Sequence, residues 1–133
     1  MKIKIKILGN ADDLTGNPLA KLRMTGPQHW RPEVQRYVRW KNLVRTEYWR
    51  QTAGRIDNAK PLTTTKEQPM RMDIKIKWKN DVHADPEGVF GSIADALFEN
   101  DKYLKGTFDF ESAPAGRGEV EITITDDARP IKT

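Results

Sequence analysis

The sequence predicts a single α+β domain spanning residues 1–133, in which a small mixed β-sheet is covered by two main helices. Two patterns support this prediction. Apolar and polar residues alternate in several short stretches, which is typical of half-buried strands, and in two longer stretches apolar residues recur every three or four positions, as in amphipathic helices. The length of 133 residues is enough for one buried core, although only 37% of the residues are hydrophobic.

The first expected element is a strand at residues 2–7, where isoleucines and lysines alternate. Lysines in this position usually protect an edge strand or face water, and contact with DNA is the alternative. A second strand is expected at 70–79, with Met72, Ile74, Ile76 and Trp78 facing inward. A final hairpin is expected to turn at 113–118, with Phe108 and Phe110 on its first strand and Val120, Ile122 and Ile124 on its second.

Pro32 is expected to open the first helix, which runs to about Gln51 after a long loop at 9–30 and before a second loop at 53–69. One face carries an apolar stripe that is predicted to be core rather than a base-stacking platform: Tyr37, Trp40, Val44 and Tyr48. The outer face is the most basic continuous surface in the sequence and is a predicted phosphate contact: Arg31, Arg36, Arg39, Lys41, Arg45 and Arg50. The second helix is expected from about Val89 to Glu99.

Charge is divided unevenly along the chain. Residues 1–84 hold 18 Lys and Arg against 8 Asp and Glu, whereas residues 85–127 hold 3 against 11. A basic surface attracts phosphate backbones, and clustered carboxylates repel them unless a cation intervenes. Binding of a polyanion together with a metal ion is the simplest interpretation that uses both halves. Solvated charge on a small domain is the alternative.

Three acids, Asp85, Glu87 and Asp101, are the candidate metal ligands. Asp85 and Glu87 follow a predicted strand two positions apart, so in an extended segment their side chains would point to the same side. Asp101 follows one short helix later, and the loop after that helix is expected to carry it back toward the other two. Mg²⁺ and Mn²⁺ prefer such oxygen ligands, and a metal-activated water can hydrolyse a phosphodiester. Exposed charge or helix capping is the alternative, above all for Asp101.

Several other classes of site are excluded by residue type. The chain has no cysteine, which rules out disulfides and thiolate metal sites and fits a reducing compartment. No apolar run approaches the length that crosses a membrane, so we expect a cytoplasmic protein without a membrane partner. There is no Ser-His-Asp arrangement, no glycine-rich phosphate loop and no zinc spacing. His83 is expected to make a local hydrogen bond rather than to bind a metal.

The acidic motif resembles the signature of a known family, the RusA-type Holliday-junction endonucleases of phages and prophages. In this chain 85–89 read DPEGV, 95–97 read DAL and 100–101 read ND. They resemble the D-P-D-N-L, D-A-L and D-D motifs of that family. The segment 18–23, PLAKLR, is similar to its P-x-x-K-x-R motif, which is a weak signal alone. The order of elements also fits, so the resemblance spans about Ile3 to Thr125.

This resemblance implies a homodimer that grips a four-way DNA junction and makes paired symmetric nicks with Mg²⁺, or with Mn²⁺ as a substitute, in DNA recombination and repair. It implies that Asp85, Glu87 and Asp101 are the metal-binding catalytic acids. Residues expected to contact DNA are Lys21 and Arg23 from the basic motif, Arg36 and Arg39 from the basic helix, and Lys75 and Lys77 from the second strand.

The chain departs from the family pattern at three positions. Glu87 stands where the family has aspartate, Gly88 stands where it has asparagine, and Gly91 stands where some members have a lysine that stabilises the transition state. Lys102 or Lys105 is the candidate replacement for that lysine. Loss of such a cation costs roughly 10²- to 10³-fold in rate. The alternative functions are therefore a catalytically weak or inactive nucleic-acid-binding protein of the same fold, or an interaction module with no nucleic-acid partner.

Overall fold

A computed structural model describes residues 2–22, 30–112 and 116–126. In these ranges, strands and helices occur in the order β1 (Lys2–Leu8), α1 (Pro32–Ala53), β2 (Met70–Trp78), α2 (Pro86–Leu97), β3 (Leu104–Ser112) and β4 (Glu119–Asp126). Neither helix is long and apolar enough to cross a membrane.

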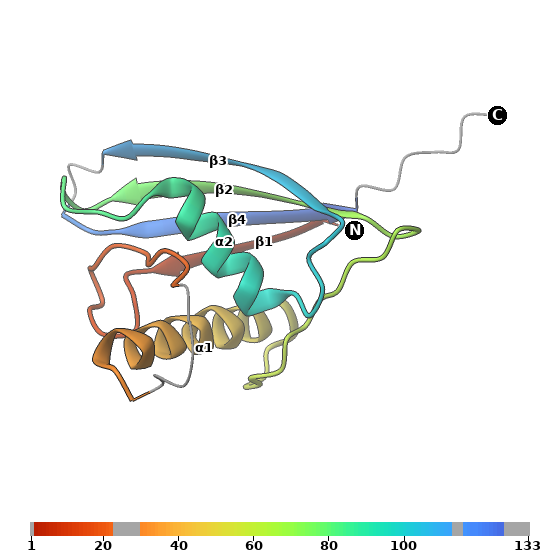
Figure 1. Cartoon of the computed structure of the whole chain (residues 1–133), viewed down its shortest axis with the longest axis horizontal. Helices are drawn as coiled ribbons and strands as arrows, with labels where there is room; N and C mark the ends of the chain where they lie inside the picture. The colour runs from red at the N-terminus through yellow and green to blue at the C-terminus, as the bar shows by residue number, and fades with distance from the viewer. Residues whose placement is uncertain (1, 23–29, 113–115, 127–133) are drawn as a thin grey trace.

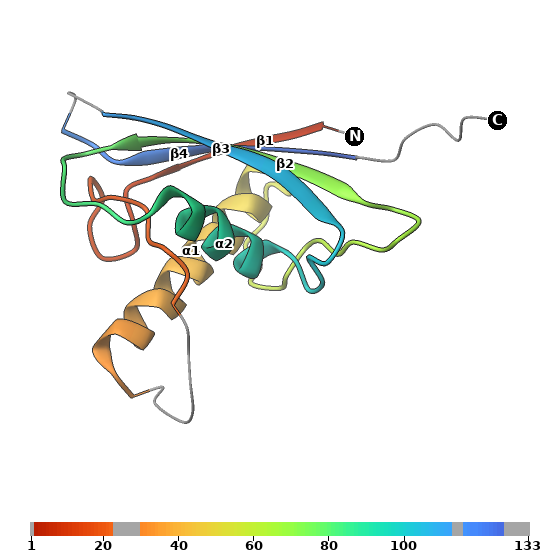
Figure 2. The same cartoon turned by 45° about the horizontal axis from the view of Figure 1, so that its top comes forward.

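The four strands form one mixed sheet in the order β1-β4-β2-β3 (Figure 1). β4 is antiparallel to both of its neighbours, and β2 is parallel to β3. Both helices lie against one face of this sheet (Figure 2). The predicted α+β architecture, with a mixed sheet covered by two helices, is therefore confirmed.

The core lies between the helices and the alternating apolar side chains of the sheet. Trp40 and Val44 of α1 and Val89 of α2 are fully buried against it, as the apolar stripes predict. The opposite face of the sheet is polar. There Lys6 lies opposite Glu121 of β4 and forms an ion pair with it at 3.4 Å.

The expected final hairpin is wrong. β3 and β4 do not pair with each other, because β4 lies between β1 and β2 while β3 forms the far edge of the sheet. Burial agrees with an inner place for β4 and an edge place for β3. Val120, Ile122 and Ile124 of the inner strand β4 are at most 1% exposed, whereas Phe108 and Phe110 of the edge strand β3 are 43% and 52% exposed.

The second helix begins and ends earlier than the apolar period indicates. It starts at Pro86, which occupies the first helical position, and Asp85 becomes its extended N-cap residue. It ends at Leu97 because Phe98 is extended and forms a bridge with Leu62. The first helix continues to Ala53 and ends at Gly54, whose positive φ of 64° suits the left-handed conformation of a helix C-terminus.

Candidate functional site

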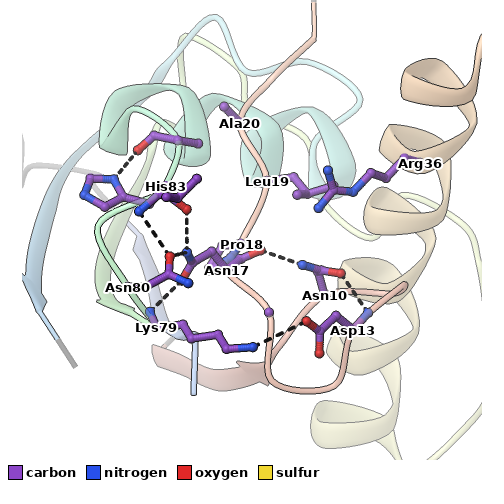
Figure 3. Close-up of a pocket in the computed structure, with 13 residues that line it drawn as sticks. Asn10, Asp13, Asn17, Pro18, Leu19, Ala20, Arg36, Lys79, Asn80 and His83 are labelled. Atoms are coloured by element: carbon purple, nitrogen blue, oxygen red, sulfur yellow. Dashed lines mark hydrogen bonds and ion pairs between the residues drawn. The ribbon is translucent and has the colours of Figure 1, made fainter. Parts of the chain in front are cut away.

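The candidate site lies at the end of the sheet where β2 finishes and α2 begins. There the segment after β1 passes alongside both elements and leaves a cavity of about 400 Å³ (Figure 3). Its polar lining comes from three parts of the chain: Asn10, Asp13 and Asn17, then Arg36 of α1, then Lys79 and His83.

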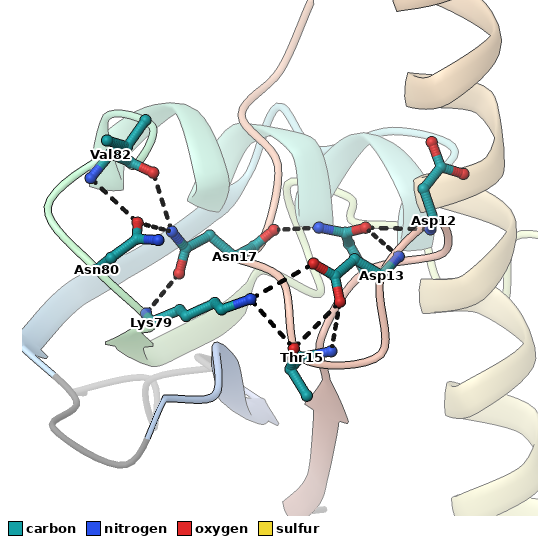
Figure 4. Close-up of polar contacts among 8 residues, drawn as sticks. Asp12, Asp13, Thr15, Asn17, Lys79, Asn80 and Val82 are labelled. Carbon is teal, nitrogen blue, oxygen red and sulfur yellow. Dashed lines mark hydrogen bonds and ion pairs between the residues drawn. The ribbon is translucent and has the colours of Figure 1, made fainter.

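Two asparagines, Asn10 and Asn17, shape the segment that borders this cavity (Figures 3 and 4). Asn10 is 2% exposed; its side-chain oxygen accepts the N–H groups of Asp12 and Asp13, and its amide donates to the Asn17 carbonyl at 2.7 Å. These bonds close a compact loop because an asparagine side chain can replace main-chain partners. The loop therefore has a defined shape without regular secondary structure.

Asn17 joins that loop to the connection between β2 and α2. Its oxygen accepts the Lys79 N–H at 2.6 Å, and its amide donates to the Asn80 side chain at 3.2 Å and the Val82 carbonyl at 3.1 Å. The Lys79 ammonium donates to the Thr15 hydroxyl at 3.2 Å. The segment that leads to Asp85 is thus held by two residues of the loop after β1, Thr15 and Asn17.

The basic segment 18–21 is held against α2 by main-chain and side-chain bonds. The Lys21 N–H donates to the Gly88 carbonyl at 2.8 Å. The buried Ser92 hydroxyl accepts the Trp40 indole N–H at 3.0 Å and donates to the Leu19 carbonyl at 2.7 Å. One serine therefore joins α1, α2 and the basic segment.

Glycine at position 88 makes this close approach possible. A β-carbon there would lie 2.7 Å from the Ala20 β-carbon, which is closer than real β-carbons pack. Any larger side chain would push the basic segment away from the helix. Glycine at position 88, where the resembled family has asparagine, thus lets residues 20 and 21 pack tightly against α2.

Lys21 lies over the other departure, Gly91. A β-carbon at position 91 would be 3.5 Å from Cδ and 3.6 Å from Cβ of Lys21, which is ordinary contact. The Lys21 side chain is exposed, and within the described residues its ammonium has no hydrogen bond or ion pair. The aliphatic part of the Lys21 side chain therefore crosses α2 at Gly91, the position where some members of the resembled family have a lysine.

Asp85 and Glu87 mark the start of α2. Both are exposed, Asp85 makes no capping bond, and neither carboxylate has a partner among the described residues. Glu87 lies in the first helical turn because the helix begins at Pro86, so the expected extended alternation does not apply to it. Both carboxylates remain free to bind a cation.

Asp101 is not brought to these two acids within one chain, so the expected return of Asp101 is wrong. It follows the other end of α2, a helix of 12 residues and thus about 18 Å long. It then leads into β3, which is parallel to β2, so it lies near the beginning of β2 while Asp85 follows the end. Across residues 2–22, 30–112 and 116–126, no three His, Asp or Glu side chains are grouped to hold a metal ion.

Lys102 directly follows Asp101 in the connection between α2 and β3. Its ammonium lies 5.6 Å from the Tyr103 ring centre, at the far end of α2 from Asp85. The stem of Lys21, rather than Lys102, lies on the face of α2 that carries Gly91.

Arg36 and Arg39 both face an acid of the loop after β1. Arg39 forms a two-bond ion pair with Asp12 at 2.7 and 2.8 Å, and Arg36 approaches the same carboxylate at 3.8 Å. The hydrogen bonds from Arg39 lower the pKa of Asp12. Arg36 also lines the cavity, which leaves it better placed than Arg39 to meet a ligand. Arg23 lies outside the described residues.

Other cations of α1 also have local partners, of which two are acids and one is a neutral amide. Lys41 pairs with Asp95 at 3.2 Å, Arg50 pairs with Glu47 at 2.6 Å, and Arg45 donates to Asn58 at 3.0 Å. The basic face that the sequence indicates is therefore less available to phosphate than its residue count suggests.

Lys75 and Lys77 lie on the polar face of the sheet, opposite the helices. Their ammonium groups are each 4.0 Å from Glu111 of β3. This face is separated by the sheet from Asp85 and Lys21, so these two lysines do not belong to the candidate site.

Asp95 of the D-A-L motif connects the two helices. Its carboxylate accepts the Tyr37 hydroxyl at 2.9 Å and the Lys41 ammonium at 3.2 Å. Burial alone would raise the pKa of Asp95, but these two partners outweigh it and lower that pKa. This acid is therefore part of the framework and not a free ligand.

His83 makes the local contacts that its sequence position indicates. Its Nδ1 lies 2.8 Å from the Ala84 carbonyl, and its ring stacks on Trp78 with centres 4.1 Å apart. The ring thus covers the end of β2 beside the cavity.

Sequence reasoning missed Asn10, Asn17 and Ser92. The only sequence signal for the two asparagines is that each follows a glycine at a boundary of the loop, and no periodicity distinguishes Ser92 from other small helix residues. Comparison of the chain with models of known protein families and with curated proteins found no match.

Proposed function

We propose that this protein is a metal-dependent endonuclease that nicks branched DNA. The observation that carries the proposal is the pair of unpartnered, exposed carboxylates Asp85 and Glu87 at the start of α2, beside the unpartnered Lys21. Most other described acids of the chain have an ion pair or a hydrogen bond. The motif resemblance at the same positions supports the same chemistry.

The donor set at Asp85 and Glu87 fits Mg²⁺ or Mn²⁺. Mg²⁺ is commonly held by one or two carboxylates, with waters and substrate phosphate oxygens as the other ligands. Such an ion supplies a water nucleophile and neutralises charge on the phosphate during hydrolysis. The two acids would hold the ion, and their own negative charge would otherwise repel DNA.

Two cations near these acids are suited to bind the DNA backbone. The exposed ammonium of Lys21 lies at the end of a stem packed over Gly91, and Arg36 lines the neighbouring cavity. Both would position a phosphate by charge. Asn17 keeps the connection to Asp85 in place through the bonds described above.

The test is cleavage of a synthetic four-way junction with Mg²⁺, Mn²⁺ or EDTA. Asp85→Asn should abolish cleavage and leave junction binding intact or tighter, because a repelling charge is removed. Asp81→Asn is the matched control, since Asp81 is another exposed and unpartnered acid of the same connection. Unimpaired cutting by Asp85→Asn, or equal loss in both variants, would reject the assignment.

A second candidate function is binding of branched DNA without cleavage. It is favoured by the absence of a three-acid group within the described part of one chain. Both functions predict DNA affinity that falls with salt, so binding alone does not distinguish them. Nicking that requires metal favours the first, and tight junction binding without nicking in either metal favours the second.

The proposed nuclease acts as a homodimer in the cytoplasm. A twofold dimer suits a four-way junction because two symmetric sites can cut two symmetric strands. The absence of cysteine fits a reducing compartment.

A further inference from the structure

The face of the sheet that lies away from the helices has an uneven distribution of charge. Both helices cover the opposite face, so the strand residues that alternate with the core point away from them (Figure 2). Directly paired residues of neighbouring strands point to the same side of a sheet, so the register arranges these residues in rows that cross the strands. The rows at one end of the face differ from those at the other.

The first row is basic on three of its four strands. Thr125 of β4 pairs with Lys2 of β1 on one side and with Arg71 of β2 on the other. Arg71 in turn pairs with Lys105 of β3. Three cations therefore lie at one level of the sheet, near the starts of β1, β2 and β3.

The second row adds Lys4 and one acid. Lys4 pairs with Thr123, which also pairs with Asp73 of β2. The Asp73 carboxylate accepts the Arg71 Nε–H at 2.9 Å and the Thr107 hydroxyl at 2.7 Å. Asp73 thus holds Arg71 in place, and the remaining guanidinium N–H groups can still donate to a ligand.

The three lysines of these rows have no acid partner. Lys2, Lys4 and Lys105 are exposed, and within the described residues their ammonium groups have no hydrogen bond or ion pair. Asp126, the acid that follows Thr125, pairs with the buried Met70 and therefore lies on the helical face. We call the resulting group the basic sheet end: Lys2, Lys4, Arg71 and Lys105.

The lysines at the other end of the same face do have acid partners. Lys6 lies 3.4 Å from Glu121. Lys75 and Lys77 each lie 4.0 Å from Glu111. Lysines that only kept the face soluble would not need to be sorted in this way. Positive charge is therefore balanced at one end of the face and available to a ligand at the other.

We propose that the basic sheet end binds the phosphate backbone of a DNA duplex, as a contact surface separate from the candidate metal site. It rests on the proposed function in one respect, the choice of DNA as the polyanion. Lysine, arginine and threonine are common phosphate contacts, and such contacts position DNA without reading its sequence.

The dimensions and composition of the surface suit a duplex. The row from Lys2 to Lys105 crosses three strand intervals and is about 14 Å wide. The DNA major groove is about 12 Å wide, so the two ends of the row can meet phosphates of both strands. In the described chain, none of the large exposed apolar side chains belongs to the two basic rows, so this surface lacks the groups that insert into a lipid membrane.

The basic sheet end is distant from Asp85. β2 has nine residues and is about 30 Å long. The basic sheet end lies at the start of β2 on the open face, whereas Asp85 follows the end of β2 and begins α2 on the covered face. One phosphate cannot contact both. Because branched DNA has several arms, this surface would hold a different arm from the one that is cut.

Lysine acetylation tests the surface without changing the sequence. The full chain is treated with limiting acetylating reagent in EDTA, with and without saturating linear duplex, and modification is measured by mass spectrometry. Bound duplex should reduce modification of Lys2, Lys4 and Lys105 at least twofold and leave Lys75 and Lys77 unchanged. Equal modification of all five with and without duplex would overturn the proposal. Protection of the first three by polyglutamate but not by duplex would also overturn it, and would identify an acidic protein segment as the occupant.

Salt-dependent binding of lysine variants gives a second measurement. The logarithm of the DNA binding constant falls with the logarithm of salt concentration, with a slope of about −0.9 for each phosphate contact. By fluorescence anisotropy in EDTA, the triple variant Lys2→Gln/Lys4→Gln/Lys105→Gln should bind duplex at least tenfold more weakly. Its slope should be smaller in magnitude by about 2 to 3.

Two further triple variants are the controls. Lys6→Gln/Lys75→Gln/Lys77→Gln removes the same charge from the same face and should keep the wild-type slope, because those lysines make no phosphate contact. Lys2→Arg/Lys4→Arg/Lys105→Arg keeps the charge and should bind like wild type. Equal slopes in the two glutamine variants, or a loss in the arginine variant as large as in the glutamine variant, would overturn the proposal.

Failure of this surface is distinguishable from failure of the nuclease because both measurements are made without metal. If wild type nicks a junction with Mg²⁺ and the first glutamine variant binds DNA like wild type, the proposal of this surface is overturned and the proposed function stands. If that variant binds weakly as expected and wild type nicks nothing with either metal, the proposed nuclease activity is overturned and this surface stands.

Discussion

The packing of the basic segment on α2 predicts opposite effects of alanine at two glycines of the same helix. At Gly88 the added β-carbon would lie 2.7 Å from the Ala20 β-carbon, so one of the two backbones must shift. At Gly91 the added carbon would lie 3.5 Å from Cδ of Lys21, which is ordinary van der Waals contact. The two substitutions add the same atom to the same helix and differ in what that atom meets.

The magnitudes follow from two opposing contributions. Replacing glycine by alanine in a helix interior stabilises by up to about 1 kcal/mol, which applies in full at Gly91 but not at Gly88 in the first turn of α2. Overpacking costs about 1–3 kcal/mol and applies only at Gly88. The free energy of unfolding should therefore rise by up to about 1 kcal/mol in Gly91→Ala, and Gly88→Ala should be about 1–3 kcal/mol less stable than Gly91→Ala.

Urea unfolding followed by circular dichroism measures both values. Adding Ala20→Gly to Gly88→Ala removes the clashing atom and should recover most of the loss, whereas adding it to Gly91→Ala should not help. If Gly88→Ala were as stable as Gly91→Ala, the segment that carries Lys21 would not be packed against α2 as described.

Three further results are expected. Ser92→Ala should lower the free energy of unfolding by about 2 kcal/mol because it leaves the buried Trp40 indole N–H unpaired. In the double variant Ser92→Ala/Trp40→Phe, the free energy of unfolding should fall by less than the sum of the two single-variant losses. Lys21→Ala should reduce the rate of junction cleavage roughly 10²- to 10³-fold, and Lys102→Ala, at the far end of α2, should not; equal effects would contradict the assignment of Lys21. Although burial alone would raise it, a hydroxyl and an ammonium partner lower the pKa of Asp95. That carboxylate therefore stabilises the fold above its ordinary pKa near 4, and this contribution is lost as pH falls through the lowered pKa, so Asp95→Asn should flatten the acid-side decline in unfolding free energy.

The strands and helices could be predicted from local pattern because their apolar faces repeat with a clear period. The alternation at 70–79 and the stripe containing Trp40 and Val44 correspond to β2 and to the buried face of α1. Pro86 is a signal for the start of α2, but the apolar period begins only at Val89, so the period alone places the predicted start too late.

The sheet order and the site could not be predicted in the same way because they depend on contacts between distant residues. Adjacent strands with a short connection favour a hairpin, yet β4 pairs with β1 and β2 while β3 runs parallel to β2. Asp101 therefore lies near the beginning of β2, whereas Asp85 follows the end of β2. Nor does spacing reveal that Lys21 crosses Gly91. Such a contact requires the loop geometry that Asn17 and its partners create.

Asp85 is proposed to hold a divalent ion at the start of α2. A Mn²⁺ binding isotherm of the full chain, followed by electron paramagnetic resonance, tests it most directly with Asp85→Asn beside the control Asp81→Asn. Wild type and Asp81→Asn should bind Mn²⁺ equally, and Asp85→Asn should bind at least tenfold more weakly. Equal binding by all three proteins would contradict the claim.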